Sequence, residues 1–400
     1  MTLSPLPVIL LMALLLPLPA HAAPPNTITL SPEVLAGTKQ RYIERDPAIM
    51  PAVEALLKDA DRCVTAPAEA VVLKPGPPPG GTMHDYWSLA PEWWPDPTRL
   101  RGSPYIYKKG TRNPEVDSDR FDRGRMRRMA RDALTLALAW YLTGNDQYAG
   151  KGCALVWSWC CDELTRTNPN LKYGRSRPGV ANGSGDGIIE TRDLIRVADA
   201  GRILSGSSLW SKVETRKLAQ WFKAYASWLQ LSDIGQEAAA FPDHRSTWHD
   251  AQLAVFALFA GDRHLARSIV EKVRQRCIIP QINQDGTMPE ELKHDHSRND
   301  TFSNLQALFV LASVGERMGI DLWRAETPDS GSIRAALDRA APYIDPDKEW
   351  PFGRSGQFDP FRYTPLFHRA ALVYKDARYL DHLKTLPRTG LRTDRALLFY

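Results

Sequence analysis

The sequence predicts an all-α protein whose helical hairpins close into an α/α toroid. Apolar residues recur at helical spacing through most of the chain, whereas strand-like alternation is short and rare. Three junctions are alike, L-T-G-N-D-Q-Y-A, L-F-A-G-D-R-H-L-A and V-Y-K-D-A-R-Y-L, and each joins two helices through a tight polar turn. Repeated antiparallel hairpins stack into a solenoid or close into a toroid. We expect the toroid, in which the loops between helices converge on one cleft.

The first residues have the composition of a secretory signal peptide. Residues 8–18 are almost uniformly apolar, and Ala20-His21-Ala22 fits the small-x-small cleavage rule. The apolar run is too short to span a bilayer comfortably, and nothing later approaches a transmembrane length. We therefore expect residues 1–22 to be a signal peptide. The mature chain, residues 23–400, is expected to form a single domain that is periplasmic or secreted and has no membrane partner.

Composition narrows the range of partners. The chain has 400 residues, of which 43% are hydrophobic and 24% charged, as is typical of a globular protein. Its formal charge of +5 suits an anionic partner, but the basic residues are dispersed, which argues against nucleic acid. An acidic polysaccharide or oligosaccharide fits the charge. The five cysteines have no metal-type spacing, and Cys153, Cys160 and Cys161 lie in one apolar stretch, as buried free thiols commonly do.

The elements follow in order after the signal peptide. Residues 23–81 form an N-terminal extension with one helix, at about 49–61, and a Pro/Gly-rich connector at 74–81. From residue 122 the pattern becomes helical, and the first long helix stops at Gly144-Asn145. The helices expected in the toroid cover residues 125–143, 148–165, 189–204, 212–231, 251–260, 266–282, 301–319, 332–344 and 365–383.

An aromatic segment precedes these helices. Residues 84–97 read H-D-Y-W-S-L-A-P-E-W-W-P-D-P, and the prolines argue against a long helix. The rings therefore lie on an irregular segment, where they either form a small core or present flat faces on which sugars stack. We take the four aromatic residues as candidates for substrate binding; they are Tyr86, Trp87, Trp93 and Trp94.

Three polar loops are candidates to form the cleft, and each comes just before a strongly apolar helix. They are residues 168–187, 241–250 and 285–300. The middle loop, F-P-D-H-R-S-T-W-H-D, holds two histidines, an arginine, two aspartates and a tryptophan in ten positions. It is either a surface loop with a helix-capping residue or a place for proton transfer. The first loop is Gly-rich but matches no phosphate-binding pattern.

Several of these segments, in this order, resemble the alginate lyase-like family of polysaccharide lyases. The resemblance runs from about residue 84 to the C-terminal region and implies an α/α toroid that cleaves a uronic-acid glycan, alginate-like or glucuronan-like, by β-elimination. The matching stretches are H-D-Y-W-S-L-A-P-E-W-W-P-D-P, S-P-Y, R-N-P-E, N-P-N-L-K-Y, G-I-I-E-T-R-D, T-W-H-D, D-G-T-M-P-E-E-L and F-S-N-L.

The chain departs from the family at its catalytic positions. The family usually carries N-N-H-G-T-W-Y-D where this chain has P-D-H-R-S-T-W-H-D. One inserted residue places His244 on the catalytic histidine and His249 on a tyrosine; without the insertion, Arg245 takes the histidine position. The family also shows E-L-x-R-T-R-S-x-x-Y-S where this chain has E-L-K-H-D-H-S-R-N-D-T. Here His294 and His296 replace arginines, and Asp300 replaces the catalytic tyrosine.

Cleavage of a uronate chain by elimination needs a base, an acid and a group that neutralises the C6 carboxylate. A base with a pKa near working pH favours histidine, with His244 first and His249 second. The acid candidates are Tyr173, Asp300 if its pKa is raised, or the basic histidine itself in a syn elimination. Cations and amides suit the carboxylate, and an aromatic ring suits the sugar. The remaining binding candidates are Asn182, Arg192, His294, His296, Arg298 and Trp248.

Other functions remain open at this stage. A glycoside hydrolase on a similar toroid would need two carboxylates about 5 or 6.5–9.5 Å apart. A third possibility is a binding protein, in which the altered residues mark lost catalysis and the aromatic segment still binds sugar. No cofactor is expected, although imidazole and carboxylate groups suit a divalent metal. The acids available to a hydrolase are Asp186, Glu190, Glu290, Glu291 and Asp300, and the residues suited to a metal are His244, His249, His294, Asp295 and His296.

Overall fold

The computed structural model describes residues 24–325, 330–353 and 356–400, so the predicted signal peptide lies outside the described residues. Its helices are α1 (Pro32–Ile43), α2 (Met50–Thr65), α3 (Arg123–Thr143), α4 (Asp146–Cys160), α5 (Ile188–Thr191), α6 (Leu194–Leu204), α7 (Lys212–Leu231), α8 (Asp233–Ala240), α9 (His244–Phe259), α10 (Arg263–Val273), α11 (Ile279–Gln281), α12 (Pro289–Leu292), α13 (Ser297–Met318), α14 (Ile333–Ala340), α15 (Thr364–Tyr374), α16 (Arg378–Leu383) and α17 (Arg388–Thr393).

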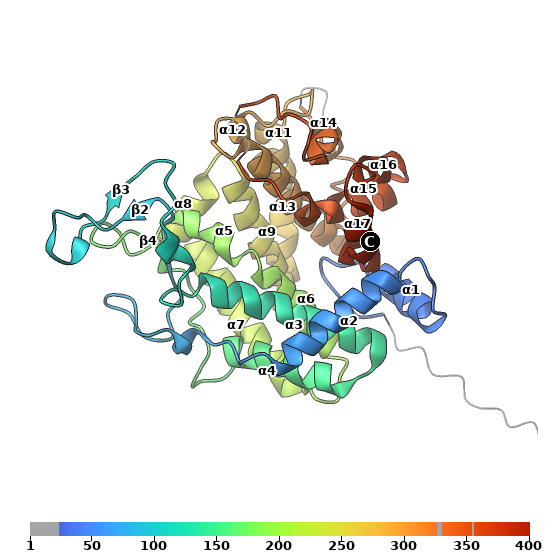
Figure 1. Cartoon of the computed structure of the whole chain (residues 1–400), viewed down its shortest axis with the longest axis horizontal. Coiled ribbons are helices and arrows are strands. Elements are labelled where there is room, and N and C mark those ends of the chain that lie inside the picture. Colours follow the sequence, from blue (N-terminus) through green and yellow to red (C-terminus); the bar gives the residue numbers. More distant parts are fainter. Residues whose placement is uncertain (1–23, 326–329, 354–355) are drawn as a thin grey trace, which may run out of the picture.

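The strands are few and short. Strand β1 (Trp87–Leu89) pairs in parallel with β4 (Tyr173–Ser176), and β2 (Trp93–Trp94) pairs antiparallel with β3 (Ile106–Tyr107). All four belong to the aromatic segment and the loops that it contacts. In Figure 1, β2 and β3 project from one side of the helical body.

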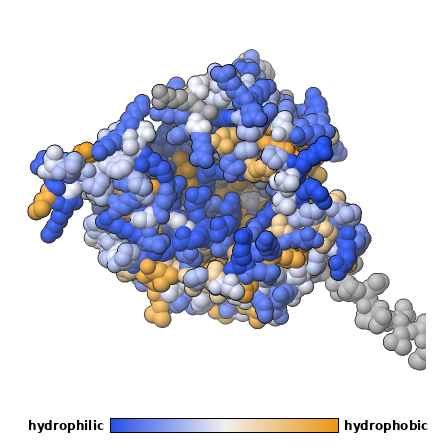
Figure 2. Space-filling view, in the orientation of Figure 1, coloured by the Kyte–Doolittle hydropathy of each residue, from blue (hydrophilic) through white to orange (hydrophobic). Residues whose placement is uncertain are grey.

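The long helices form a ring of two layers. The inner helices α3, α6, α9, α13 and α15 pack one against the next, and the outer helices α4, α7, α10 and α14 pack on their backs (Figure 1). This arrangement confirms the all-α toroid. Helix α9 is buried almost all round, as expected of an inner helix that packs against its neighbours α6 and α13 and is covered by α7 and α10. Figure 2 shows hydrophilic residues gathered around a hollow in the centre of one face.

The two ends of the chain close the ring. The C-terminal helices pack against α1 and α2, and the Thr38 hydroxyl donates to the Leu398 carbonyl at 3.1 Å. The segment before α1 crosses between inner helices, because Asp199 on α6 accepts from the Ile28 backbone at 2.6 Å and Arg317 on α13 donates to the Leu30 carbonyl at 2.9 Å. The N-terminal extension is therefore part of the toroid's core.

Helix boundaries differ from the expected ones at two informative places. Helix α9 begins at His244 rather than near residue 251, because the Asp243 side chain caps it by accepting from the Arg245 backbone at 3.0 Å. Residues 244–250 of the segment predicted to be a loop therefore form the first two turns of this helix. The single helix expected at 365–383 is two helices, α15 and α16, separated at Lys375, whose φ of 53° is left-handed.

The fold also determines the state of the cysteines. All five cysteines are buried and free, as expected for Cys153, Cys160 and Cys161. Burial raises the pKa of the Cys153 thiol to about 12, which makes it unreactive.

Within the described part of the chain, no helix combines the length and apolarity that a bilayer crossing requires.

Candidate active site

His244 opens α9 and is held by one carboxylate. Its Nδ1 lies 2.7 Å from Glu291 Oε2 on α12, and its backbone N–H donates to Glu291 Oε1 at 2.6 Å. Asn304 on α13 donates to the same Oε1 at 2.9 Å. Because a carboxylate only accepts, Nδ1 carries the proton of the neutral ring and Nε2 presents the lone pair. That nitrogen faces Asp300, whose Oδ1 is 3.9 Å away.

A second histidine lies beside the first. His294 Nδ1 is 3.1 Å from Asp300 Oδ2, its Nε2 is 3.4 Å from Asp243 Oδ2, and its ring centre is 5.9 Å from that of His244. Hydrogen bonds to Asp243 and Asp300 raise the pKa of His294 to about 10. The ring is therefore an imidazolium at neutral pH, a cation at a position where the family usually has arginine.

The electrostatics of His244 are a balance of opposed effects. Burial lowers its pKa, but the charges of Glu291, Asp300 and Asp243 outweigh burial and leave the pKa above the ordinary histidine value. Asp243 behaves in the opposite sense, because burial raises its pKa while Arg245 and His294 lower it much further. The site therefore contains a fixed anion at Asp243 and a histidine that titrates above its ordinary range.

Three loops far apart in sequence meet at this point. Arg245 Nη1 donates to Asp186 Oδ1 at 2.7 Å and its Nε donates to Asp243 Oδ1 at 2.8 Å, which ties the first polar loop to the second. The pair of His244 and Glu291 ties the second loop to the third. The expected convergence of the three loops on one site is confirmed.

An outer cleft adjoins this site. It is a cavity of 1130 Å³ lined by Trp93 and Tyr107 of the β2–β3 hairpin, whose ring centres are 6.0 Å apart. The Arg177 guanidinium lies 5.5 Å from the centre of the Trp93 ring. Three arginines and two aromatic rings suit a sugar that carries carboxylates. The other polar residues of the wall are Glu92, Arg112, Arg175, Asp186, Asp295 and His296.

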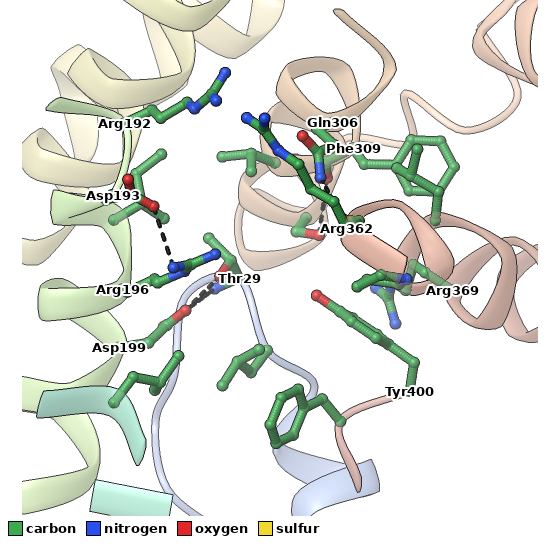
Figure 3. Close-up of a pocket in the computed structure, with 18 of the residues that line it drawn as sticks. Thr29, Arg192, Asp193, Arg196, Asp199, Gln306, Phe309, Arg362, Arg369 and Tyr400 are labelled. Atoms are coloured by element: carbon green, nitrogen blue, oxygen red, sulfur yellow. Dashed lines mark hydrogen bonds and ion pairs between the residues drawn. The ribbon is translucent and has the colours of Figure 1, made fainter. Parts of the chain in front are cut away.

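An inner cavity lies in the hole of the toroid (Figure 3). It has a volume of 430 Å³, and all five inner helices contribute to its wall. Arg192 donates to Ser303 Oγ at 3.1 Å and lies 5.4 Å from the centre of the Trp248 ring. The side chains of Arg192 and Arg362 point into the same space in Figure 3. Within the described ranges, neither arginine forms an ion pair with a carboxylate, so both are available to an anionic ligand.

The two cavities lie on either side of the histidines. Trp248 follows His244 by one turn of α9, and Ser303 follows Asp300 by one turn of α13. The Trp248 indole donates to Ser303 Oγ at 2.9 Å, which joins these two helices one turn below the histidines. The outer cleft lies on the other side of the histidines, and Asp186, Asp295 and His296 form the part of its wall nearest to them.

His249 and Arg298 lie away from the site and contact other parts of the fold. His249 is buried with Nδ1 3.0 Å from Asp250 and Nε2 3.1 Å from the Leu229 carbonyl on α7, so both ring nitrogens are engaged in packing. Arg298 donates to the carbonyls of Tyr343 and Asp345 and lies over Phe358. The structure assigns both residues to holding neighbouring helices and loops, because their polar groups already have partners within the fold.

The aromatic segment divides into a small core and one half-buried ring, Trp93, at the outer cleft. Tyr86 donates to Glu190 at 2.9 Å and Trp87 donates to Ser176 at 3.0 Å; both are buried, and Tyr173 packs in the same small core as Trp87. These three residues therefore lie in the scaffold and line neither of the two cavities. Trp93 faces the outer cleft, whereas Trp94 donates to the Thr111 carbonyl and lines neither cavity.

Of the remaining predicted residues, three line a cavity and one does not. His296 lines the outer cleft, and Arg192 and Trp248 line the inner cavity. Asn182 is exposed on the loop after β4 and lines neither cavity.

Sequence reasoning missed several residues of the site. Glu291 was considered only as an acid of a hydrolase, yet it is the partner of His244. The sequence R-S-R beside the Gly-rich loop carried the signal for Arg175 and Arg177, since two cations flank a predicted cleft. No sequence signal marked Arg362, which reaches the inner cavity from the segment before α15.

Comparison with known proteins agrees with this geometry. The family model described as alginate lyase matches residues 71–350. The crystal structure of an alginate lyase from Bacteroides ovatus aligns with a TM-score of 0.86 and 31% identity, over 94% of this chain and 99% of that chain. A search of curated proteins finds no match.

A more distant enzyme shares the fold. Alginate lyase A1-III from Sphingomonas species A1 aligns with a TM-score of 0.57 and 18% identity, over 95% of this chain and 99% of that chain. A tyrosine variant of that enzyme, complexed with tetrasaccharide, aligns at 17% identity with a TM-score of 0.57, over 94% of this chain and 97% of that chain. Since the family model covers most of the chain and the Bacteroides ovatus structure aligns along nearly all of it, the protein belongs to the alginate lyase family of polysaccharide lyases.

Proposed function

We propose that this polysaccharide lyase cleaves an acidic glycan, alginate-like or glucuronan-like, by β-elimination with His244 as the base. The observation that carries the proposal is the orientation of His244, whose Nδ1 is bound by Glu291 while Nε2 points toward Asp300. A base oriented by a carboxylate is suited to abstracting a proton from carbon. The names of the relatives, which act on alginate, support the same substrate class.

The C5 proton of a uronate becomes acidic only when charge on its C6 carboxylate is neutralised. His294 supplies a fixed imidazolium within 6 Å of the base, as the ring-centre distance of 5.9 Å indicates. Arg192 and Arg362 supply further cations on the side of the inner cavity. A cation fixed in a partly buried site stabilises the developing enolate more than the same cation in water would.

The leaving glycosidic oxygen needs a proton. Asp300 stands where the family has its catalytic tyrosine, and its carboxyl lies 3.9 Å from His244 Nε2. In a syn elimination, His244 protonated by the first step returns that proton to the oxygen, and Asp300 stabilises the imidazolium. This route uses one side chain, His244, for both proton transfers.

Substrate recognition and location complete the proposal. The arginines of the outer cleft and the partly buried ring of Trp93 bind the sugars that flank the cleavage point. Export through the signal peptide at residues 1–22 places the enzyme in the periplasm or outside the cell, where polysaccharides occur.

The experiment that tests the proposal uses a panel of acidic polysaccharides. Alginate, glucuronan and pectate are incubated with the mature chain, and near-ultraviolet absorbance and reducing ends are followed together. A lyase produces both signals, because each cleavage creates an unsaturated uronyl end. Reducing ends without absorbance would establish a hydrolase, and retention of polymer with neither signal would establish a binding protein.

A further inference from the structure

We propose that His244, Glu291, His294 and Asp300 together bind one zinc ion. One nitrogen or oxygen from each of these four side chains lies within 4.8 Å of the others. Glu291 Oε2 is 2.7 Å from His244 Nδ1 and 3.8 Å from His294 Nδ1, and Asp300 Oδ2 is 3.1 Å from the same His294 nitrogen. The four side chains are called the zinc cluster below.

The spacing suits a small tetrahedral ion. Zinc binds imidazole nitrogen and carboxylate oxygen at about 2.0–2.2 Å, which places neighbouring donors roughly 3.4 Å apart. The three separations given above lie on both sides of that distance, and the donors as a group lie within 4.8 Å of one another. The widest pair therefore has to close by at most about 1.4 Å, from 4.8 Å to roughly 3.4 Å, for the donors to enclose the ion. Calcium and magnesium prefer all-oxygen sites with more ligands, which this cluster does not supply.

The residues around the zinc cluster hold its donors in place. His294 Nε2 faces Asp243 at 3.4 Å, so Nδ1 is left to face the cluster. Asp243 is itself fixed by Arg245, and Asn304 donates to Glu291 Oε1, so Oε2 is left to face the histidines. Metal-binding histidines and carboxylates are usually oriented by such outer hydrogen bonds.

Charge gives a further reason. Glu291 is buried and Asp300 is half-buried, and Asp243 adds a third carboxylate against the back of His294. Without a metal, Arg245 and the protonated His294 ring balance part of this negative charge. Zinc would take over that role as it displaces the ring proton from the nitrogen that it binds. The site differs from the set that sequence alone suggested, because His249 is engaged elsewhere and Asp295 and His296 are exposed on the outer cleft.

Zinc and the proposed elimination exclude one another. A zinc ion coordinated by His244 takes the lone pair of one ring nitrogen and leaves the proton on the other, so the ring no longer acts as a base. This consequence rests on the proposed function, whereas zinc binding itself does not. The protein would therefore be a lyase that zinc inhibits reversibly, with chelation restoring turnover.

Isothermal titration calorimetry tests the proposal directly. The mature, tag-free chain is treated with a chelator, dialysed and titrated with zinc chloride at pH 7.5. We expect one ion per chain, and at least tenfold weaker binding in His294→Gln and in Asp300→Asn. The matched control is His264→Gln, an exposed histidine on α10 away from the cluster, which should bind as the unchanged chain does.

Circular dichroism checks that each variant is folded before titration. Absence of saturable binding, or equal affinity in the three variants and the unchanged chain, would overturn the zinc site. The result is independent of turnover. Zinc binding by a chain that forms no unsaturated product would contradict only the lyase proposal, and turnover without zinc binding would contradict only the zinc site.

Discussion

At the scale of single residues, Glu291 determines what His244 can do. Its two oxygens bind the backbone and the ring of His244 separately, so the ring cannot rotate without breaking a charge-assisted hydrogen bond. This leaves Nε2 as the reactive nitrogen, beside Asp300. Removing the imidazole should therefore remove the chemistry and spare the binding surfaces of the two cavities.

We predict that His244→Ala lowers kcat by about 10²–10⁴-fold, the usual contribution of a general base. KM should change little, since Trp93 and the cleft arginines bind the sugars from other elements. Steady-state kinetics on an acidic polysaccharide, followed by the absorbance of unsaturated ends, measures both constants. The control is His249→Gln, whose ring packs against Leu229 outside the site. Loss of kcat in the control alone would transfer the role of base to His249.

Sequence reasoning reached the candidate base but could not reach its partner. His244 stands out because it lies in a polar segment that matches a family motif. Glu291 lies 47 positions away, and only the packing of α12 against the start of α13 brings its carboxylate to the ring. His249 lies five positions further along the same helix and contacts a different neighbour, the Leu229 carbonyl on α7. Its orientation could not be predicted from the sequence motif.

At the scale of elements, the β2–β3 hairpin forms a wall of the outer cleft. Its two strands present Trp93 and Tyr107 to the cavity, while Trp94 on the same strand turns away and donates to Thr111. Successive residues of a strand point to opposite faces, which explains why adjacent tryptophans have different roles.

We predict that Trp93→Ala raises KM for polymeric substrate about tenfold, since losing one aromatic contact costs roughly 1–1.5 kcal/mol. The kcat value should remain within about twofold, because the ring touches none of the proposed catalytic groups. Trp94→Ala is the matched control and should leave KM nearly unchanged. Equal effects of the two substitutions would mean that the hairpin acts through its stability rather than through sugar binding.

Asp122 and Lys74 form a buried ion pair where the connector, the aromatic segment and the start of α3 meet. Asp122, the residue before α3, accepts from the Trp87 backbone at 2.9 Å and lies 3.0 Å from Lys74 Nζ, so it joins the connector, the aromatic segment and the ring. Burial raises the pKa of Asp122 to about 6, against the opposing effect of Lys74. A carboxyl whose pKa is raised on folding stabilises the fold at low pH and loses that contribution as pH rises.

We predict that this contribution to the free energy of unfolding decreases between pH 4 and about 6. The window lies between the ordinary pKa of 3.8 and the raised pKa of about 6. A tenfold change in the affinity of a carboxylate for its proton corresponds to about 1.4 kcal/mol. Urea unfolding of the unchanged chain and of Asp122→Asn measures the contribution, and the stability difference between them should move in favour of the variant as pH rises through the window. A difference that is constant with pH would contradict the raised pKa.

The sequence predicts where most of the long helices lie, but it predicts the residues at which they begin and end less well. The helix at 212–231 is confirmed at both ends, because Ser211 and Glu214 form a capping box at its start. The start of α9 was placed seven residues too late, since its first turn is polar and buried at once. Apolar periodicity cannot reveal a helix whose polar residues face a binding site.

At the scale of the whole molecule, the toroid explains why a few residues that are far apart in the sequence can act together. The start of α9 and the start of α13 lie at one end of the ring, where α12 and the Gly-rich loop also arrive. The toroid itself was predictable from repeated hairpins. Its closure by the two chain ends was not, because Ile28, Leu30 and Leu398 act through backbone groups that carry no sequence signal.

The central claim is that side chains from three separate loops carry out an elimination on a uronate chain. Mass spectrometry of the products from the unchanged enzyme and from His244→Ala tests it most directly. The account predicts that the unchanged enzyme releases unsaturated oligosaccharides, each lighter by one water than the hydrolysis product of equal length, and that the variant releases almost none. Saturated products from the unchanged enzyme, or unsaturated products at an undiminished rate from His244→Ala, would contradict it.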